Sequence, residues 1–368
     1  MTKTDRIPEL DGLRGIAILM VLVGHILQQA ERLSGQNFPG WIKTIIDMNW
    51  AGVELFFVLS GFLITSILLQ IKNKPNYFTN FYARRILRIF PVYYVVLTII
   101  FIIYFVTKRA DIITILQTSM WFYTYAHNWL FVSNVAPGLY FAHLWSLAIE
   151  EQFYLIWPLV VFRIETKQIF SLGAIAIFVA ILFRIGAILL STEYLNTFPY
   201  YSTVTRVDGL MLGAILAAGF QTGLEKQLSK DALKILILAS ALVSISIAFQ
   251  PESPLWNNTV MLTAGISGVA LLSASLVIIA VAWNEAHFMR RFLRHPSLVF
   301  FGKYSYGLYL FLWPVTSWII DVLSKTNSVN PINWLVFSSA CFMITVVLAL
   351  ISWKLVEQPI LKFKHYFE

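Results

Sequence analysis

Ten long apolar stretches follow one another along this chain of 368 residues, and they constrain its fold more than any other feature. A helix needs about 20 apolar residues to cross a bilayer, and most of the stretches approach that length. Charged residues make up only 12% of the chain, against roughly a quarter in soluble domains. The sequence therefore predicts an all-α, polytopic membrane bundle of about ten transmembrane helices. The predicted spans are residues 11–29, 51–71, 89–107, 145–162, 169–190, 206–221, 232–249, 258–283, 303–324 and 332–355.

Basic residues gather in the loops on one side of these spans. With the N-terminus in the cytoplasm, most Lys and Arg residues fall on the cytoplasmic side, which predicts that both termini are cytoplasmic. The same asymmetry accounts for the net charge of +8 without nucleic acid as a partner. We expect the first span to be retained and residues 1–368 to form a single transmembrane domain with no appended soluble domain. The mixed, aromatic stretch 112–131 is expected to be an interfacial helix or a re-entrant segment.

Three ionisable residues share one face of the first span. Asp11, Arg14 and His25 fall within about 40° of each other at helical pitch, and about 16 Å separates Arg14 from His25. An anionic group held by Arg14 and a proton acceptor at His25 would therefore lie toward opposite sides of the membrane. Because ionisable groups are costly in lipid, this placement indicates a function.

Several other ionisable residues are predicted to lie at the depth of His25. Alternate spans run inward and outward, which brings four of the spans together at this layer. Isolated charges in lipid pair with one another or line a wet cavity, so the convergence indicates a functional cavity. The structural alternative is that His25 is an interfacial residue and that Glu54 simply pairs with Arg206. The residues expected in this layer, besides His25, are Glu54, His143, Glu150, Glu151, Arg206 and Asp208.

On the cytoplasmic side, Arg84, Arg85 and Arg88 open the third span. Arg85 and Arg88 are three residues apart and share a helix face, and planar guanidinium groups suit phosphate. The alternative is a topology anchor, although Arg14 at the same level favours a site for a phosphorylated cofactor. The basic cluster 290–294 is expected to serve as an anchor or a lipid contact.

Other residues predict packing or exclude particular chemistry. Ser60 and Gly61 are expected to allow close helix packing, and Cys341 to be a buried thiol. The histidines are not spaced as a ligand set, so no metal is predicted. Aromatic residues toward the outer side could stack on sugar rings, although interfacial anchoring explains them equally well. These are Trp121, Tyr123, Tyr125, Trp129, Tyr140 and Trp145.

These segments resemble those of the acyltransferase family 3 membrane proteins, which are bacterial multi-pass O-acyltransferases. The resemblance covers essentially the whole chain in the family's order, and its first and fourth motifs are specific. The matching stretches are RIPELDGLRGIAILMVLVGH (6–25), GVELFFVLSGFLI (52–64), FYARRILRIFPVYY (81–94), LWSLAIEEQFYLIWPL (144–159), RVDGLMLGA (206–214), YSYGLYLFLWP (304–314) and LVEQP (355–359).

The resemblance implies transfer of an acyl group, usually acetyl from cytoplasmic acetyl-CoA, to a hydroxyl of a glycan such as O-antigen or exopolysaccharide beyond the bacterial inner membrane. It implies that His25 is the base or the acyl carrier and that Glu150 belongs to the fourth-span motif, with Glu54 or Glu150 orienting the imidazole. Both versions need an uncharged His25, so we expect the rate to fall on acidification. The expected donor-binding residues are Asp11, Arg14, Arg85 and Arg88, and the expected acceptor-binding residues are Trp145, Glu151, Arg206 and Asp208.

Two functions of other classes remain as alternatives. In a secondary transporter or lipid-linked sugar flippase, the same charges would line a proton or substrate path. No inverted repeat is apparent between the halves of the chain, which disfavours a transporter. A membrane scaffold without chemistry would tolerate His25→Ala.

Overall fold

The computed structural model describes residues 7–35, 38–107, 112–133, 141–190, 197–249, 259–325 and 334–367, and these residues form helices and connecting turns with no β-strand. The long helices are α1 (Pro8–Ser34), α3 (Ala51–Ile71), α4 (Tyr77–Val106), α7 (Trp145–Arg163), α8 (Gln168–Leu190), α10 (Thr203–Gln221), α11 (Glu225–Ala248), α12 (Ile266–Ala282), α14 (Pro296–Lys325) and α15 (Trp334–Ser352). The short ones are α2 (Gly40–Asp47), η1 (Met48–Trp50), α5 (Ile112–Tyr123), α6 (Asn128–Val132), η2 (Ala142–Leu144), α9 (Phe198–Tyr201), η5 (Met261–Gly265), α13 (Phe288–Leu293), η6 (Trp353–Glu357), α16 (Gln358–Leu361) and η7 (Lys362–Phe367).

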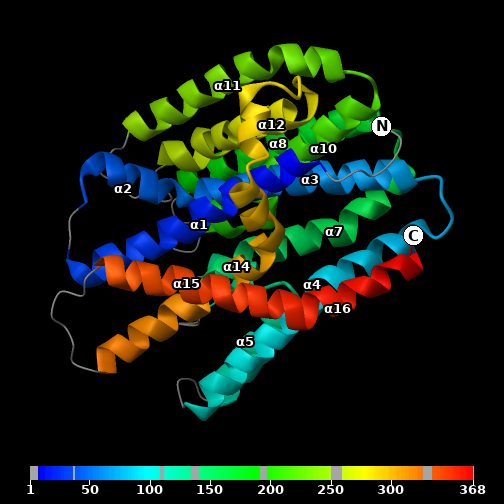
Figure 1. The fold of residues 1–368 in the computed structure, drawn as a ribbon. Helices are drawn as coiled ribbons and strands as arrows, with labels where there is room; N and C mark the ends of the chain where they lie inside the picture. Colours follow the sequence, from blue (N-terminus) through cyan, green and yellow to red (C-terminus); the bar gives the residue numbers. More distant parts are fainter. Residues whose placement is uncertain are drawn as a thin grey trace.

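Each of the ten predicted spans corresponds to one long helix. Within the described residues, nine helical stretches are long and apolar enough to cross a membrane. The tenth long helix, α7, has 19 residues and is not among the nine; it carries Glu150, Glu151 and Arg163. The prediction of an all-α, polytopic membrane bundle is confirmed (Figure 1).

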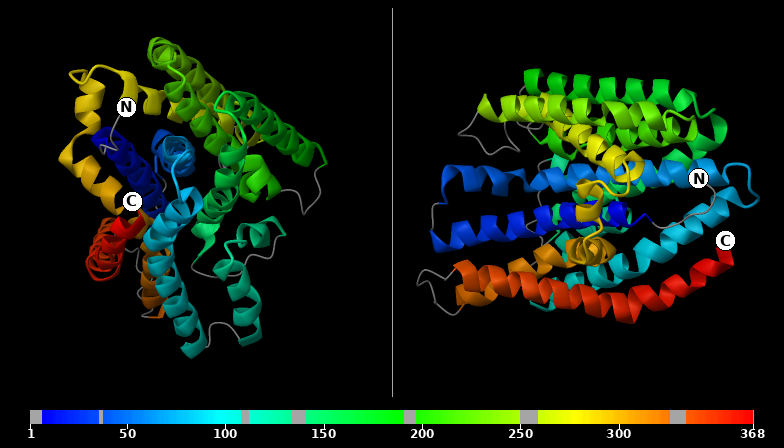
Figure 2. Two further views of the ribbon diagram at one scale, coloured as in Figure 1. Left: turned by 90° about the vertical axis from the view of Figure 1, so that its right-hand side faces the viewer. Right: turned by 45° about the horizontal axis from the view of Figure 1, so that its top comes forward.

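The helices α1 and α3 form the centre of the bundle, as the end-on view in Figure 2 shows. Leu13 and Leu22 of α1 and Phe57 of α3 are fully buried. In contrast, α8 and α11 lie at the periphery and expose apolar side chains such as Phe178 and Leu238, as spans that face lipid do. The central position of α1 places its ionisable residues inside protein.

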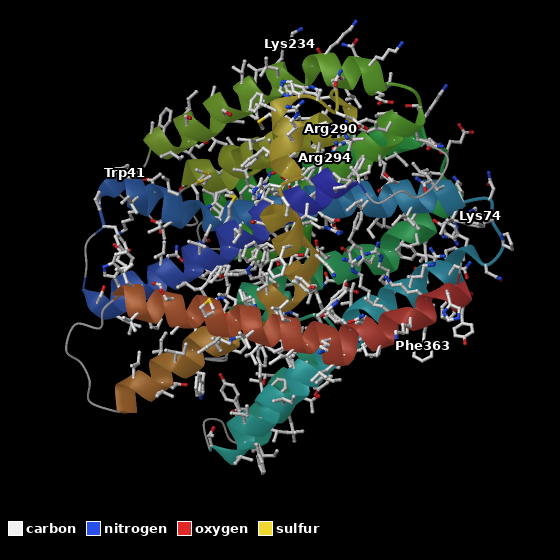
Figure 3. The ribbon with its side chains drawn as sticks, viewed as in Figure 1. Trp41, Lys74, Lys234, Arg290, Arg294 and Phe363 are labelled. Atoms are coloured by element: carbon white, nitrogen blue, oxygen red, sulfur yellow. The ribbon has the colours of Figure 1, made fainter. Side chains whose placement is uncertain are left out.

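The first described helix begins on the side of the bundle where the last one finishes, although α1 starts nearer the middle. We call the end at which η7 finishes the proximal end, and the opposite end the distal end (Figure 1). Lys74 marks the proximal end and Trp41 the distal end in Figure 3. Because α1 is one unbroken helix, Arg14 and His25 are separated along it by about 16 Å, with His25 on the distal side.

The segment after α4 turns back into the bundle. α5 packs antiparallel to the distal half of α4, and its last residues lie beside the middle of that helix: the hydroxyls of Tyr93 and Tyr94 donate to the carbonyl oxygens of Phe122 and Tyr123 at 2.8 and 3.0 Å. α6 then lies against α7, where Gln152 donates to the Asn128 side chain at 2.9 Å. Of the two alternatives for 112–131, these contacts match the re-entrant segment.

Gly61 allows α3 and α10 to pack with their backbones in contact. A Cβ atom at Gly61 would lie 1.9 Å from the carbonyl oxygen of Leu210, and one at Gly213 would lie 2.1 Å from that of Val58. No side chain fits at such distances, so the two helices would have to separate. The prediction that small residues here allow close helix packing is confirmed, and Cys341 is buried as predicted.

We expect Gly61→Ala to destabilise the bundle, because it forces α3 away from α10 and disturbs the core between them. The matched control is Gly186→Ala on α8, where a Cβ would meet nothing within 4 Å. That control should be neutral or stabilising by about 0.5–1 kcal/mol, since glycine is unfavourable inside a helix. Thermal unfolding in detergent measures both, and equal transitions for the two variants would contradict the backbone contact.

Candidate active site

Three arginines line one cavity on the proximal side of the bundle. It has a volume of ≈ 100 Å³ and is formed by α1, α3, α4, α7 and α14. We call it the arginine pocket. Arg85 and Arg88 reach it from the same face of α4, as their spacing predicts, while Arg84 points elsewhere and donates to the carbonyl oxygen of Phe367 at 2.7 Å. The residues lining the pocket are Arg14, Val53, Phe56, Phe57, Leu59, Ser60, Arg85, Arg88, Ile89, Ser146, Leu147, Glu150, Tyr154, Ser305, Tyr306 and Tyr309.

The charges of the arginine pocket are only partly compensated by the protein. Arg14 pairs with Asp11 at 3.7 Å. Within the described residues Arg85 and Arg88 take part in no ion pair, although the Arg85 guanidinium lies over the Tyr154 ring, 5.4 Å from its centroid. Uncompensated guanidinium groups inside a membrane bundle are costly, and an anionic ligand would satisfy them. Their arrangement therefore favours a phosphate site over a simple topology anchor.

Glu150 belongs to the arginine pocket rather than to the surroundings of His25. Its side chain lines the cavity together with Ser60 and Tyr154, whose hydroxyls contact each other. Its neighbour Glu151 does not line the cavity, and its buried Oε1 has no hydrogen-bond partner among the residues that the structure describes. The adjacent pair of carboxylates is thus divided between two surroundings.

His25 is held by side chains that precede α3 and by its own helix. Its Nδ1 lies 3.1 Å from the Asn49 side-chain nitrogen and 3.4 Å from Gln28 Oε1. Gln28 in turn donates through Nε2 to Asp47 at 3.0 Å. A carboxylate only accepts, so Asp47 fixes the Gln28 amide with its oxygen toward His25.

As the two amides stand, these contacts ask for opposite tautomers of His25: the Gln28 oxygen favours a proton on Nδ1, whereas the Asn49 nitrogen would donate to that atom. Asp47 fixes the Gln28 amide, so we turn the Asn49 amide by 180°, which gives Nδ1 a second acceptor and removes the conflict. The lone pair of the neutral ring is then on Nε2. Gly24 makes the approach possible, because a Cβ there would lie 2.3 Å from the Cβ of Asn49.

A layer of side chains lies between the arginine pocket and His25. Tyr309 lines the pocket, and Trp313, one turn further along α14, packs against His25 with ring centroids 5.5 Å apart. The ring of His143 contacts both of them, with centroids 4.9 Å from Tyr309 and 6.3 Å from Trp313. The cavity extends to Tyr309 and Ser146 and does not reach His25. A ligand arm passing from the pocket to His25 must displace these side chains.

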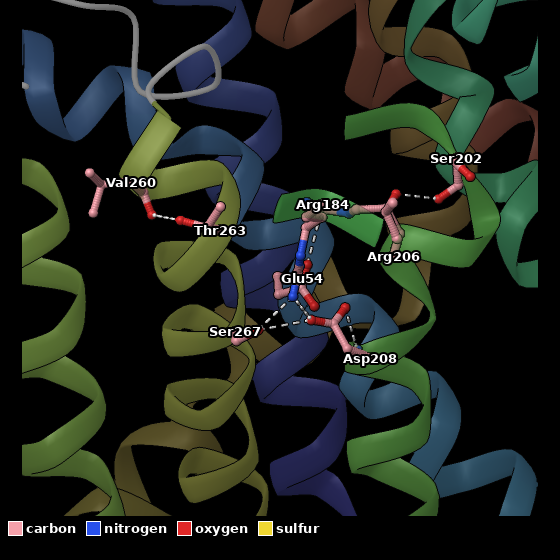
Figure 4. Close-up of polar contacts among 10 residues, drawn as sticks. Glu54, Arg184, Ser202, Arg206, Asp208, Val260, Thr263 and Ser267 are labelled. Atoms are coloured by element: carbon pink, nitrogen blue, oxygen red, sulfur yellow. Dashed lines mark hydrogen bonds and ion pairs between the residues drawn. The ribbon is translucent and has the colours of Figure 1, made fainter. Parts of the chain in front are cut away.

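Glu54, Arg206 and Asp208 come together in a separate buried cluster with Arg184, which we call the ion-pair quartet (Figure 4). Arg206 pairs with Glu54 and Arg184 with Asp208, each at 2.8 Å, and the four side chains are at most 2% exposed. Arg184 and Asp208 also bind the Ser267 hydroxyl. Glu54 is therefore paired with Arg206, which is the structural alternative given for it above. It does not contact the His25 ring, which is held by Asn49 and Gln28 instead.

The aromatic residues expected at an acceptor site do not gather in one place, because some are buried and others are exposed. Trp145 is buried against the quartet, with the Arg206 guanidinium 5.4 Å from its ring centroid, and Tyr125 stacks on Tyr93 at 4.4 Å. Trp121 and Tyr123 on α5 are exposed. Tyr140 lies outside the described residues.

The basic cluster 290–294 has a structural partner. Arg290 and Arg294 both bind the carboxylate of Glu9 at 2.6 Å, which ties the start of α1 to α13. Figure 3 shows the two arginines at the centre of the molecule, beside α1. They anchor one helix to another rather than lining the arginine pocket.

Sequence reasoning did not identify several of these neighbours. Gln28 is one turn from His25 on α1, a spacing that could have indicated it. Asn49 reaches His25, and Asp47 reaches Gln28, only because the segment that precedes α3 packs beside α1. In the described residues, no three His, Cys, Asp and Glu side chains gather as a metal site, so no metal ligands are assigned.

The fold and the site define a class: a polytopic membrane protein with three arginines lining an internal pocket and a histidine further toward the distal end of α1. Comparison with protein families agrees, because a model described as "Acyltransferase domain" matches residues 7–353. The chain belongs to the acyltransferase 3 family, and the resemblance of its motifs is confirmed.

Among curated proteins, the O-acetyltransferase OatA of Staphylococcus aureus is 30% identical over 382 residues, which cover 97% of this chain and 57% of the relative. The peptidoglycan O-acetyltransferase OatA of Listeria monocytogenes is 32% identical over 389 residues, 98% of this chain and 57% of the relative. The putative peptidoglycan O-acetyltransferase YrhL of Bacillus subtilis is 30% identical over 383 residues, which cover 96% of this chain and 55% of the relative. The chain thus spans a little over half the length of these relatives. No solved structure matches it.

We expect Asp208→Asn to destabilise the protein by about 3–5 kcal/mol, because it leaves Arg184 buried without a counter-charge. The control is Asp231→Asn, which breaks an exposed pair with Lys234 at 3.7 Å and should cost at most about 1 kcal/mol. Denaturant unfolding of both variants measures the difference. An Asp208→Asn protein that is as stable as wild type but inactive would instead assign the quartet to substrate binding.

Proposed function

We propose that this protein is an O-acyltransferase of the bacterial inner membrane, which moves an acetyl group from cytoplasmic acetyl-CoA to a hydroxyl of a glycan beyond the membrane. The observation that carries the proposal is the placement of the arginine pocket and His25 along one central helix. Arg14 lines the pocket, and His25 lies about 16 Å further toward the distal end. An acetyl donor bound in the arginine pocket could therefore deliver its acetyl group at His25, closer to the opposite side of the membrane.

The proximal end is the cytoplasmic end in this proposal. The loop after α3 carries Lys72 and Lys74, and the segment after α7 carries Lys167, so basic residues flank the spans there. Such loops stay on the cytoplasmic side. The arginine pocket would then take its ligand from the compartment that contains acyl-CoA.

The arginine pocket would hold the phosphate groups of the donor. Arg85 and Arg88 provide guanidinium groups without carboxylate partners among the described residues, and Asp11 orients Arg14. The extended pantetheine arm would pass Tyr309 and Trp313 and bring the thioester to His25. Its length is of the order of the helical separation of about 16 Å.

His25 would act through Nε2. Asn49 and Gln28 engage Nδ1, and the lone pair on Nε2 can take a proton from the acceptor hydroxyl or attack the thioester itself. In the first case the hydroxyl oxygen attacks the acetyl carbon directly. In the second an acetylated histidine forms and passes the acetyl group on.

The acceptor would be a carbohydrate of the cell envelope on the distal side. Two of the relatives are named for peptidoglycan, and a surface polysaccharide such as O-antigen or exopolysaccharide offers the same hydroxyl chemistry. Membrane lipids surround the bundle as further partners.

The decisive experiment reconstitutes the purified protein in liposomes with labelled acetyl-CoA on one side and cell-envelope glycan on the other. Wild type should acetylate the glycan, and His25→Ala should abolish transfer, because no other group at that position can serve as base or carrier. Mass spectrometry of the glycan measures the added acetyl. Movement of glycan across the membrane without consumption of acetyl-CoA would instead identify a transporter.

We expect Arg88→Gln to raise the KM for acetyl-CoA by about 10- to 100-fold, because a charge-assisted hydrogen bond contributes about 1.5–3 kcal/mol. Arg84→Gln is the matched control, since Arg84 lies on the same helix and binds the Phe367 carbonyl instead of lining the pocket. It should change the KM little. An equal effect of both substitutions on initial rates would contradict a donor site built on the pocket face of α4.

A further inference from the structure

His143 is a second histidine beside His25 to which the proposed function gives no task. It lies in η2, just before α7, and is 4% exposed. Its ring and that of His25 both pack against Trp313, with centroids 6.3 and 5.5 Å from the indole. His143 therefore belongs to the layer between the arginine pocket and His25.

The contacts of His143 determine where its proton is. Nε2 lies 2.9 Å from the backbone carbonyl oxygen of Tyr309, which only accepts, so Nε2 carries the hydrogen. Burial lowers the pKa of His143 well below its usual value, and the nearby His25 lowers it further. The ring is therefore neutral, with its lone pair on Nδ1.

Nδ1 of His143 is buried and has no hydrogen-bond partner in the described structure. An unsatisfied buried polar atom costs about 1–3 kcal/mol, so such atoms call for an explanation. The indole Nε1 of Trp313, in the same layer, is also buried and has no acceptor within the described part of the chain. Nδ1 of His143 can accept a hydrogen bond from a hydroxyl, and Nε1 of Trp313 can donate one to a carbonyl oxygen. The sugar that receives the acetyl group has such a hydroxyl, and the acetyl group has such a carbonyl.

Tyr309 fixes His143 in this position. Its carbonyl oxygen holds the ring nitrogen, and its hydroxyl donates to the backbone carbonyl oxygen of His143. Ser146 in turn contacts the Tyr309 hydroxyl at 2.8 Å and lines the arginine pocket. The imidazole is thus held firmly between the donor pocket and His25.

An acetylated His25 cannot be the base for the second half of the reaction. In the first half, Nε2 of His25 attacks the thioester carbon, the C–N bond forms, and the C–S bond breaks to release the CoA thiolate. The acetylimidazolium that results keeps its proton on Nδ1. In the second half, a hydroxyl oxygen attacks the acetyl carbon, the new C–O bond replaces the C–N bond, and the hydroxyl proton needs an acceptor other than His25.

We propose that His143 is this acceptor: its Nδ1 takes the proton of the attacking hydroxyl while His25 carries the acetyl group. His25 leaves as the neutral imidazole with its Nδ1 proton, and His143 becomes the imidazolium. His143 then releases its proton to water, and the CoA thiolate takes up a proton. Over both halves, acetyl-CoA and a hydroxyl are converted to CoA thiol and an acetyl ester. The inference rests on the proposed function and deepens it, because it chooses the carrier version and names the second base.

The test is His143→Gln in the full-length protein with radiolabelled acetyl-CoA. Glutamine places an amide nitrogen where Nε2 was, so the bond to the Tyr309 carbonyl is kept while the Nδ1 lone pair is lost. His143→Asn places an amide at the Nδ1 position without a basic nitrogen and serves as the second variant. The matched control is His127→Gln, because His127 is also buried and binds a backbone carbonyl, that of Leu144, at 2.8 Å, but stacks on Phe122 instead of Trp313.

Label bound to the protein and label released are measured separately, with soluble peptidoglycan fragments or water as the acceptor. Both His143 variants should take up acetyl on His25 and retain it, with release slowed by about 10²–10⁴-fold. His127→Gln should release acetyl as wild type does, and His25→Gln should take up none. A role of His143 in folding alone would lower uptake and release together, so retention of the acetyl group is the specific result.

Three results would overturn the inference. They are release at the wild-type rate by His143→Gln, loss of acetyl uptake in both His143 variants, and transfer by wild type with no acetyl on His25. In the third case the proposed function stands, because transfer still occurs. A wild-type protein that consumes no acetyl-CoA would defeat the proposed function itself.

Discussion

Charge inside a membrane has to be paired, and this constraint organises the bundle. Two buried pairs, Glu54 with Arg206 and Arg184 with Asp208, hold α3, α8 and α10 together, and Glu9 binds two arginines of the α13 region. Breaking one partner of such a pair costs several kcal/mol, so these contacts fix the arrangement of the helices. Arg85 and Arg88 differ from these arginines: among the described residues they have no ion-pair partner, and they line a cavity in which a ligand can compensate their charge.

The spans and the faces of single helices could be predicted from sequence. Each of the ten apolar stretches is a helix, and the spacing of Arg85 and Arg88 does bring them to one pocket. The depth of each residue in the membrane was harder to predict, because the prediction assumed that every span begins at a membrane surface. The re-entrant segment delays the start of α7, so Glu150 lies beside Ser60 and the arginines instead of beside His25. Hydropathy reports which residues are apolar, not the level at which a helix starts.

The partners of His25 could not be predicted for a different reason. Asn49 precedes α3 and is 24 residues from His25 in sequence, and it meets the ring because Gly24 lets the two segments approach, while Asp47 acts on the ring only through Gln28. Such contacts depend on the packing of two helices and leave no periodic signal in either one. Trp313 is in the same position, since only the folded bundle brings α14 to the ring of His25, whereas His143, which packs on the same indole, was expected at this depth. The site is therefore a product of tertiary structure built on a predictable helix.

The quartet also has a consequence for how the protein is made. Glu54 and its partner Arg206 are 152 residues apart, so the carboxyl leaves the ribosome long before the guanidinium exists. At roughly 5–20 residues per second, the interval is on the order of ten to thirty seconds. An unpaired carboxylate is not stable in lipid for that time. During biosynthesis α3 therefore has to wait inside the insertion machinery, or carry Glu54 as the neutral acid, until α10 arrives.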